Sequence, residues 1–152
     1  MAYINNEKQD LLLKYLCMAL LYDVMVDYEG NIYILNEIDP SCKDIGYITA
    51  RIQDVERLMC AENVMIENIR PYLRPMSSMT EEEYLQYHHI KYNIVTYRHG
   101  YKRFDVGKFR NVGIIPIKEY LDWLLKNHFD FMGLIPKDLA IEVTKENNPY
   151  KN

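Results

Sequence analysis

Residues Pro71–Glu83 read Pro-Tyr-Leu-Arg-Pro-Met-Ser-Ser-Met-Thr-Glu-Glu-Glu, and this stretch divides the chain into an N-terminal and a C-terminal part. Pro71 and Pro75 fix their own φ and disfavour helix in the residues before them. Thr80 and Glu83 have the spacing of a capping box, in which each side chain bonds to the backbone N–H of the other residue. The stretch therefore predicts a stiff connector over residues 71–79 that leads into a helix.

The N-terminal part begins with the pattern of a helix followed by a hairpin. Apolar residues recur every three or four positions from Glu7 to Tyr22, which indicates an amphipathic helix. Residues 24–28 and 31–36 predict two strands, joined by a tight turn in which Gly30 can adopt the required positive φ. The hairpin is expected to end at the Asp-Pro-Ser sequence of residues 39–41.

Between the hairpin and Pro71 the sequence leaves the choice between strand and helix open. Short runs that are rich in β-branched residues favour strands over residues 47–52, 55–60 and 64–69. Residues 54–59 also fit a helical turn, and residues 66–69 also fit a short helix.

The C-terminal part predicts two helices. The helix after Thr80 begins with three glutamates, whose charge complements the helix dipole. Pro116 fits the first position of a second helix over residues 117–127. Residues 139–143 fit a final strand or short helix, and residues 147–152 are expected to be frayed.

Together these elements predict one α+β domain over residues 1–152. Its sheet is small and antiparallel or forms a partly open barrel, with the N-terminal helix and two further helices packed on it. The expected parts are a helix and sheet (1–70), a proline connector (71–79), a helical and C-terminal part (80–146) and a frayed tail (147–152). An apolar content of 49% and a charged content of 26% are typical of a globular chain.

The chain is expected to be cytoplasmic, without a membrane partner. The apolar run from Leu11 to Leu21 is interrupted by Lys14, lacks a basic flank and is too short to cross a bilayer. The three cysteines contain no Cys-x-x-Cys pair, which predicts reduced thiols and neither a disulfide framework nor a zinc site. Cys17 is expected to pack in the core.

No motif identifies a catalytic site, a metal or a cofactor. His88 and His89 are adjacent and therefore point to different faces of a helix, unlike the paired ligands of a zinc protease. His128 lies near Asp122 and Asp130, where it fits a structural role at a helix C-terminus better than the role of a general base. The sequence predicts a protein that is not an enzyme.

Charge and aromatic residues are unevenly distributed, and two candidate binding regions follow. Residues 1–50 hold eight Asp or Glu against three lysines, and the chain has 14 tyrosines, a residue favoured at interfaces. We interpret the hairpin region as an acidic face for a protein partner. Its candidate residues are Asp23, Asp27, Tyr28, Glu29, Tyr33, Glu37 and Asp39.

The second region, residues 97–110, interleaves basic and aromatic side chains. Cations that contact phosphates and aromatic rings that stack on bases suit single-stranded nucleic acid, although an amphipathic hairpin gives the same pattern. The candidate residues of this alternative site are Tyr97, Arg98, Tyr101, Lys102, Arg103, Phe104, Lys108 and Arg110.

Several blocks of the sequence resemble a family of small uncharacterised proteins encoded by Bacteroidales, their mobile elements and gut phages. The similar blocks are Pro71–Glu83, Leu11–Leu20, Asp122–Leu124 and His128–Ile135. Two departures place Asp23 and Asp138 where the family often has glycine. The resemblance implies no particular activity, and its genomic setting suggests a host-takeover or counter-defence role.

The sequence thus predicts a non-catalytic accessory protein that binds a macromolecular partner. A protein partner is expected, and the mechanism would be steric, because an acidic face can occupy a basic surface. Nucleic-acid binding through residues 97–110 and association with a second copy remain as alternatives.

Overall fold

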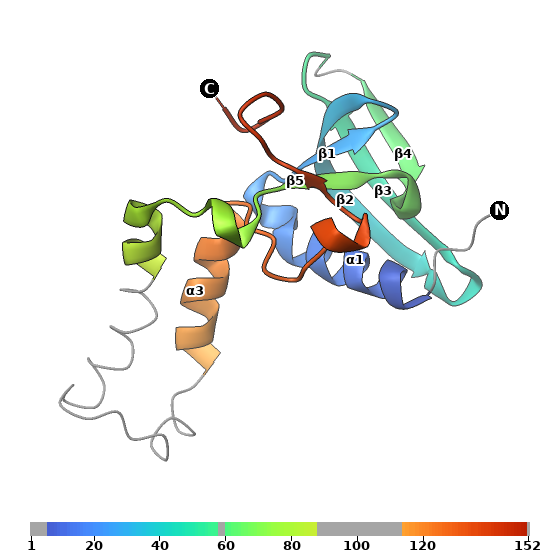
Figure 1. Cartoon of the computed structure of the whole chain (residues 1–152). Coiled ribbons are helices and arrows are strands. Elements are labelled where there is room, and N and C mark those ends of the chain that lie inside the picture. Colours follow the sequence, from blue (N-terminus) through green and yellow to red (C-terminus); the bar gives the residue numbers. More distant parts are fainter. Residues whose placement is uncertain (1–5, 58–59, 88–113, 152) are drawn as a thin grey trace.

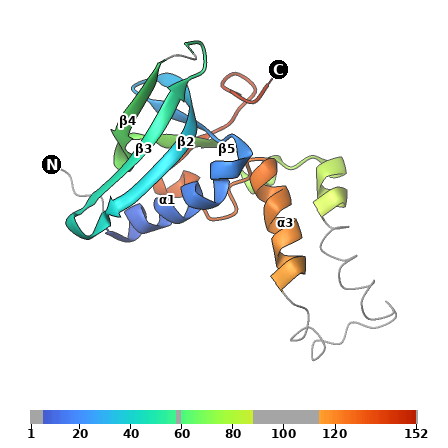
Figure 2. The same ribbon diagram turned by 180° about the vertical axis from the view of Figure 1, so that it is seen from behind.

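The computed structural model of the chain describes residues 6–57, 60–87 and 114–151. It has an α+β architecture, as the sequence predicts, in which a six-stranded open sheet has the strand order β4-β3-β2-β1-β5-β6. Helix α1 (Asn6–Ala19) continues as the 3₁₀ turn η1 (Leu20–Tyr22) and lies along one face of the sheet (Figures 1 and 2). Helix α3 (Ile114–Lys126) and a helix over residues 81–87 project from the sheet.

The sheet is mostly antiparallel. Its strands are β1 (Met25–Tyr28), β2 (Asn31–Cys42), β3 (Tyr47–Asp54), β4 (Ala61–Met65), β5 (Arg70–Leu73) and β6 (Ile141–Glu142). The pairs from β4 through β5 are antiparallel, and β6 runs parallel to β5.

The predicted hairpin is confirmed, with one correction at its far end. Glu29 and Gly30 have φ values of 51° and 81°, which are the signs of the two-residue turn that matches strand twist. Strand β2 does not end at residues 39–41 but continues to Cys42. Pro40 is tolerated there because it lies in a register shift between Asp39 and Cys42, where no ladder hydrogen bond is required of it.

The residues for which the sequence left strand and helix open adopt different structures in the two halves of the segment. Residues 55–57 form neither, because the Asp54 carboxylate accepts hydrogen bonds from the N–H groups of Glu56 and Arg57 and starts a turn. Residues 61–65 form strand β4, and residues 66–68 form the 3₁₀ turn η3.

The expected proline connector is wrong in its first half, since residues 71–73 lie inside the sheet as part of β5. Pro71, Tyr72 and Leu73 are buried, and Pro71 pairs with Val26 of β1. Pairs in an antiparallel ladder alternate between bonded and non-bonded. The Tyr150 hydroxyl bridges the Met25 N–H and the Tyr72 carbonyl, which therefore occupy a bonded position of the ladder. The neighbouring pair of Val26 and Pro71 is then a non-bonded one. The missing N–H of Pro71 therefore costs no ladder bond.

The capping box is confirmed and ties the projecting helices to the sheet. The Glu83 N–H donates to the Thr80 hydroxyl (3.1 Å), and the Thr80 N–H donates to the Glu83 carboxylate (3.0 Å). That carboxylate also accepts two hydrogen bonds from Arg74, whose guanidinium lies 4.3 Å from the ring centre of Phe129. Arg74, by hydrogen bonding, holds the pKa of Glu83 below its usual value.

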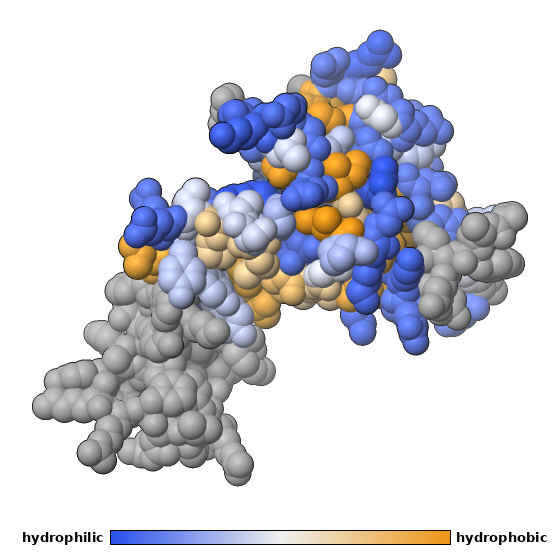
Figure 3. All heavy atoms as spheres, viewed as in Figure 1, coloured by the Kyte–Doolittle hydropathy of each residue, from blue (hydrophilic) through white to orange (hydrophobic). Residues whose placement is uncertain are grey.

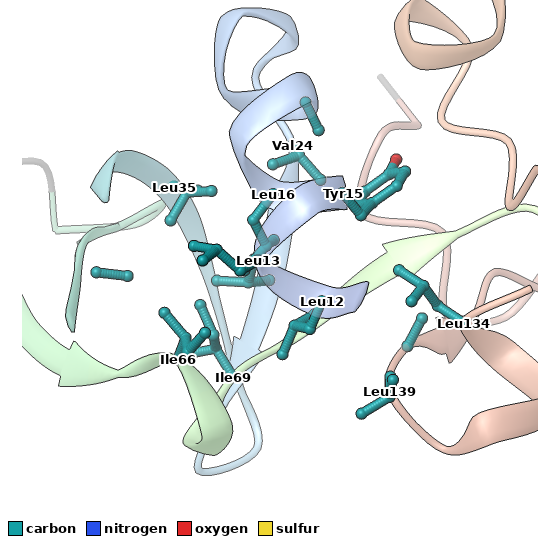
Figure 4. Packing of buried hydrophobic residues seen from close by; sticks show 14 of the residues in the cluster. Leu12, Leu13, Tyr15, Leu16, Val24, Leu35, Ile66, Ile69, Leu134 and Leu139 are labelled. Carbon is teal, nitrogen blue, oxygen red and sulfur yellow. The ribbon is translucent and has the colours of Figure 1, made fainter. Parts of the chain in front are cut away.

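The core lies between α1, the sheet and the C-terminal segment. Figure 4 shows Leu12 and Leu16 of α1 between strand residues such as Leu35 and C-terminal residues such as Leu134. Cys17, in contrast to the prediction, is exposed on the opposite side of α1. Alternation along β2 and β3 turns Leu35 and Ile52 toward this core and leaves their neighbours on the outer face of the sheet.

The C-terminal tail is not frayed over residues 147–151. The Tyr150 hydroxyl accepts a hydrogen bond from the Met25 N–H (3.0 Å) and donates to the Tyr72 carbonyl (2.8 Å). It therefore fills the position at which β1 and β5 would otherwise bond directly. The tail is ordered because this hydroxyl satisfies two backbone groups at the seam between the strands.

We predict that Tyr150→Phe lowers the free energy of unfolding by about 1–3 kcal/mol, because it leaves these two backbone groups without a partner. Tyr47→Phe is the matched control, since Tyr47 is 54% exposed and should tolerate the change. Denaturant titration of both variants measures the difference. Equal stability of the two variants would contradict the bridging role of Tyr150.

Candidate functional site

The topology brings two turns to the same end of the sheet. The β1–β2 turn at Glu29-Gly30 and the β3–β4 turn after Asp54 lie together, and the Val55 N–H donates to the Ile32 carbonyl between them. Tyr33 is directly opposite Asp54, and Glu62 of β4 is opposite Ile52, so their side chains share the face of Asp54. The resulting group, called the acidic tyrosine end, comprises Tyr28, Glu29, Tyr33, Asp54 and Glu62.

The two tyrosines form the aromatic part of the acidic tyrosine end. Their ring centres are 5.9 Å apart, with an angle of 71° between the ring planes. Tyr33 is only 7% exposed and packs with the core, whereas Tyr28 is half-buried. Burial, together with Glu29 and Glu62, raises the pKa of Tyr28. Burial also raises the pKa of Tyr33, with further contributions from Glu62, Asp54 and Glu29.

Both tyrosine hydroxyls lie beside carboxylates, and the upward pKa shifts reflect this negative surrounding together with burial. Negative charge next to aromatic rings suits a cation, such as a Lys or Arg side chain, through ion pairing and cation–π contact. One carboxylate oxygen of Asp54 accepts hydrogen bonds from two backbone N–H groups of its turn, whereas Glu29 and Glu62 are exposed. Glu29 and Glu62 are therefore the carboxylates best placed to meet a ligand.

The other residues of the predicted acidic face do not belong to this group. Asp27 is on the outer face of the sheet, with the Tyr72 hydroxyl 3.4 Å from its carboxylate. Glu37 lies opposite Arg51 in the next strand. Asp39 accepts a hydrogen bond from the Ser41 N–H, and its hydrogen bonds to Ser41 lower its pKa. Asp23 has a φ of 51° and ends η1.

The structure thus brings together Tyr28, Glu29 and Tyr33 and separates Asp23, Asp27, Glu37 and Asp39 from them. Sequence reasoning missed Asp54 and Glu62, because their places depend on the register of β3 and β4. The separation of Asp27 from Tyr28 could have been predicted, because adjacent residues of a strand point to opposite faces of the sheet.

The alternative nucleic-acid site lies outside the described residues. This applies to Tyr97, Arg98, Tyr101, Lys102, Arg103, Phe104, Lys108 and Arg110.

His128 occupies a structural position at the end of α3. Its φ of 59° and the bond from its N–H to the Leu125 carbonyl form a left-handed helix end, which the backbone makes without the imidazole. The imidazole stacks on the Tyr150 ring, with ring centres 3.6 Å apart and an interplanar angle of 9°. Its Nδ1 is buried and has no hydrogen-bond partner among the described residues.

The carboxylates near His128 in sequence have other partners. Asp130 accepts hydrogen bonds from the N–H groups of Leu134 and Ile135, and Asp122 accepts one from the Tyr22 hydroxyl (2.6 Å). Burial, helped by the nearby Arg74 charge, lowers the pKa of His128 to about 4. His128 is thus a neutral, stacked side chain that, within the described part of the chain, has no hydrogen-bonded acid or base.

Two further observations concern classes of site. Within residues 6–57, 60–87 and 114–151, no three His, Cys, Asp or Glu side chains are grouped so that they could hold a metal ion. In the same described ranges, no helix is both long and apolar enough to cross a membrane.

Comparison of the chain with protein-family models, with curated proteins and with solved structures gave no significant match.

We predict that the burial of His128 makes stability depend on pH. Its pKa falls from 6.5 to about 4 on folding, so the unfolded chain binds the proton more readily, and stability should decrease as pH falls through this interval. The loss by the end of the interval is on the order of 2 kcal/mol, after allowance for partial exposure.

His128→Phe is the control, because it keeps a flat ring beside Tyr150 and removes the proton. Denaturant titrations at neutral pH and near pH 4 should show a smaller change in unfolding free energy for this variant than for the wild type. An identical change in both proteins would show that His128 does not titrate in this way.

Proposed function

We propose that the protein is a non-catalytic binding protein that recognises a basic region of another protein through the acidic tyrosine end. The observation that carries the proposal is the convergence of Glu29, Asp54 and Glu62 on the paired rings of Tyr28 and Tyr33. Carboxylates attract a cationic partner from a distance, and the aromatic rings add contact area.

The remainder of the surface supports a binding role of limited area. In the view of Figure 3, apolar residues show between hydrophilic ones over the sheet. Exposed apolar side chains include Ile32 of β2 and Tyr47 of β3, which are 38% and 54% exposed. Such side chains are ordinary on a protein surface, so over the described residues the proposal rests on charge rather than on a large apolar patch.

The biological role within this proposal comes from the sequence resemblance. If the chain acts like an accessory protein of a phage or mobile element, its acidic tyrosine end occupies a basic surface of a host protein, such as a nucleic-acid channel. Inhibition is then steric and requires no catalytic group.

The test is affinity capture with paired charge variants. Glu29→Asn with Glu62→Gln removes two carboxylates, and the Asn-Gly sequence it creates suits the β1–β2 turn, so folding is preserved. Glu81→Gln with Glu82→Gln removes two exposed carboxylates from the helix over residues 81–87 and serves as the control. Each tagged protein is used to capture partners from a Bacteroidales lysate, with and without nuclease.

We expect a nuclease-resistant protein that the wild type and the control capture and that the first variant loses. Each removed carboxylate should weaken binding by about fivefold, which corresponds to about 1 kcal/mol. Equal capture by both variants would contradict the proposal. Material recovered only without nuclease would favour the nucleic-acid alternative, in which removal of Arg98, Lys102 or Arg103 reduces the salt dependence of binding.

A further inference from the structure

Strand β4 is the outermost strand beside the acidic tyrosine end, and its outer side has no partner among the described residues. Proteins usually protect such an edge with lysine, proline, a bulge or a covering segment. The sequence of β4, Ala-Glu-Asn-Val-Met, contains no lysine or proline. It pairs with β3 over five successive residues without a register shift. Among the described residues, the edge is therefore regular and lacks lysine, proline, a bulge and a covering segment. Its one charged side chain, Glu62, disfavours an added strand that brings no cation.

The phase of the ladder shows which backbone groups face outward. The Asp54 N–H donates to the Cys60 carbonyl (3.0 Å), which makes residues 54 and 60 a hydrogen-bonded pair. Because bonded and non-bonded pairs alternate, Glu62 and Val64 bond to β3. The N–H and C=O groups of Ala61, Asn63 and Met65 then point away from the sheet.

We propose that β4 accepts an extended, basic segment of a partner protein as an additional strand. This inference rests on the proposed function and deepens it, because it states how the partner lies against the acidic tyrosine end. The outward backbone groups of Ala61, Asn63 and Met65 supply hydrogen bonds that do not depend on the partner's sequence. Glu62 and Val64 supply the sequence preference.

The side chains of β4 define what the added strand must carry. Glu62, which belongs to the acidic tyrosine end, is exposed, whereas Val64 is buried on the same face two residues later. Residues that lie opposite one another in paired strands share a face. The added strand should therefore carry a Lys or Arg opposite Glu62, to form an ion pair, and an apolar residue opposite Val64, to pack against it. These two residues are two positions apart in the segment.

Charge also argues against a second copy as the occupant. An antiparallel pair of β4 strands centred on Asn63 would place the two Glu62 side chains diagonally on one face, about 7 Å apart. No cation of β4 would lie between them. A basic segment instead places its cation directly opposite Glu62.

A synthetic peptide, acetyl-Thr-Val-Thr-Lys-Thr-Val-Thr-amide, tests the proposal in titrations with the full chain. It carries the required Lys and Val in either strand direction. Asn63→Pro removes an outward N–H without touching a bond to β3, and proline is compatible with an edge strand in that position. Asn63→Thr keeps the N–H and is the control.

We expect Asn63→Pro to weaken peptide binding by at least about tenfold while Asn63→Thr binds as the wild type does. A peptide with Gln in place of Lys should bind about fivefold more weakly to the wild type and show no such loss with Glu62→Gln. Thermal unfolding of Asn63→Pro confirms that the variant is folded.

The outcomes separate the two proposals. If Asn63→Pro weakens peptide binding but the Lys and Gln peptides bind equally well, strand addition is retained and recognition of the cation is overturned. Preference for Lys with no effect of Asn63→Pro would overturn strand addition and retain the acidic tyrosine end. Absence of peptide binding at millimolar concentration would overturn the inference. So would a wild-type dimer in sedimentation equilibrium that Asn63→Pro converts to a monomer, because the edge would then belong to a second copy.

Discussion

The structure depends on satisfying the backbone of β5 on both of its edges. β5 joins the antiparallel strands to the C-terminal segment: it pairs with β1 on one side and with β6 on the other. Buried N–H and C=O groups must have hydrogen-bond partners, and for β5 these partners are not all backbone groups of the neighbouring strands. Pro71 falls where no N–H is needed, and the Tyr150 hydroxyl bridges the place where β1 and β5 separate.

The same strand positions the projecting helices. Past its end, the Arg74 N–H donates to the His128 carbonyl, and the Asp130 N–H donates to the Arg74 carbonyl. The Arg74 side chain reaches Glu83 and stacks on Phe129, which in turn stacks on Trp123 of α3. The polar residues near His128 are therefore explained by the needs of the fold.

Local sequence signals predicted the local elements well. The capping box at Thr80, the apolar period of α1 and the Glu29-Gly30 turn each depend on neighbours within a few residues. Pairing across long sequence distances was not predictable from such signals. Pro71 and Pro75 suggested a connector, because the place of Pro71 in a non-bonded pair depends on β1 and Tyr150, which lie far from it in sequence.

The candidate site shows the same division. Tyr28, Glu29 and Tyr33 are close in sequence, and their grouping was predicted. Asp54 and Glu62 join them only through the register of three strands. Alternation places Asp27 on the other face, and the register shift between Leu35 and Glu37 moves Glu37 opposite Arg51. Asp23 and Asp138 both have positive φ, a conformation that glycine adopts readily.

We propose that a basic partner binds at the acidic tyrosine end and along β4. Amide hydrogen exchange, measured by NMR on the full chain with and without the captured partner, tests it most directly. In the free protein, the outward amides of Ala61, Asn63 and Met65 should exchange faster than those of Glu62 and Val64, and the partner should slow all three outward amides. Slowed exchange confined to α3 or to the outer face of β1 and β2, with β4 unchanged, would contradict the claim.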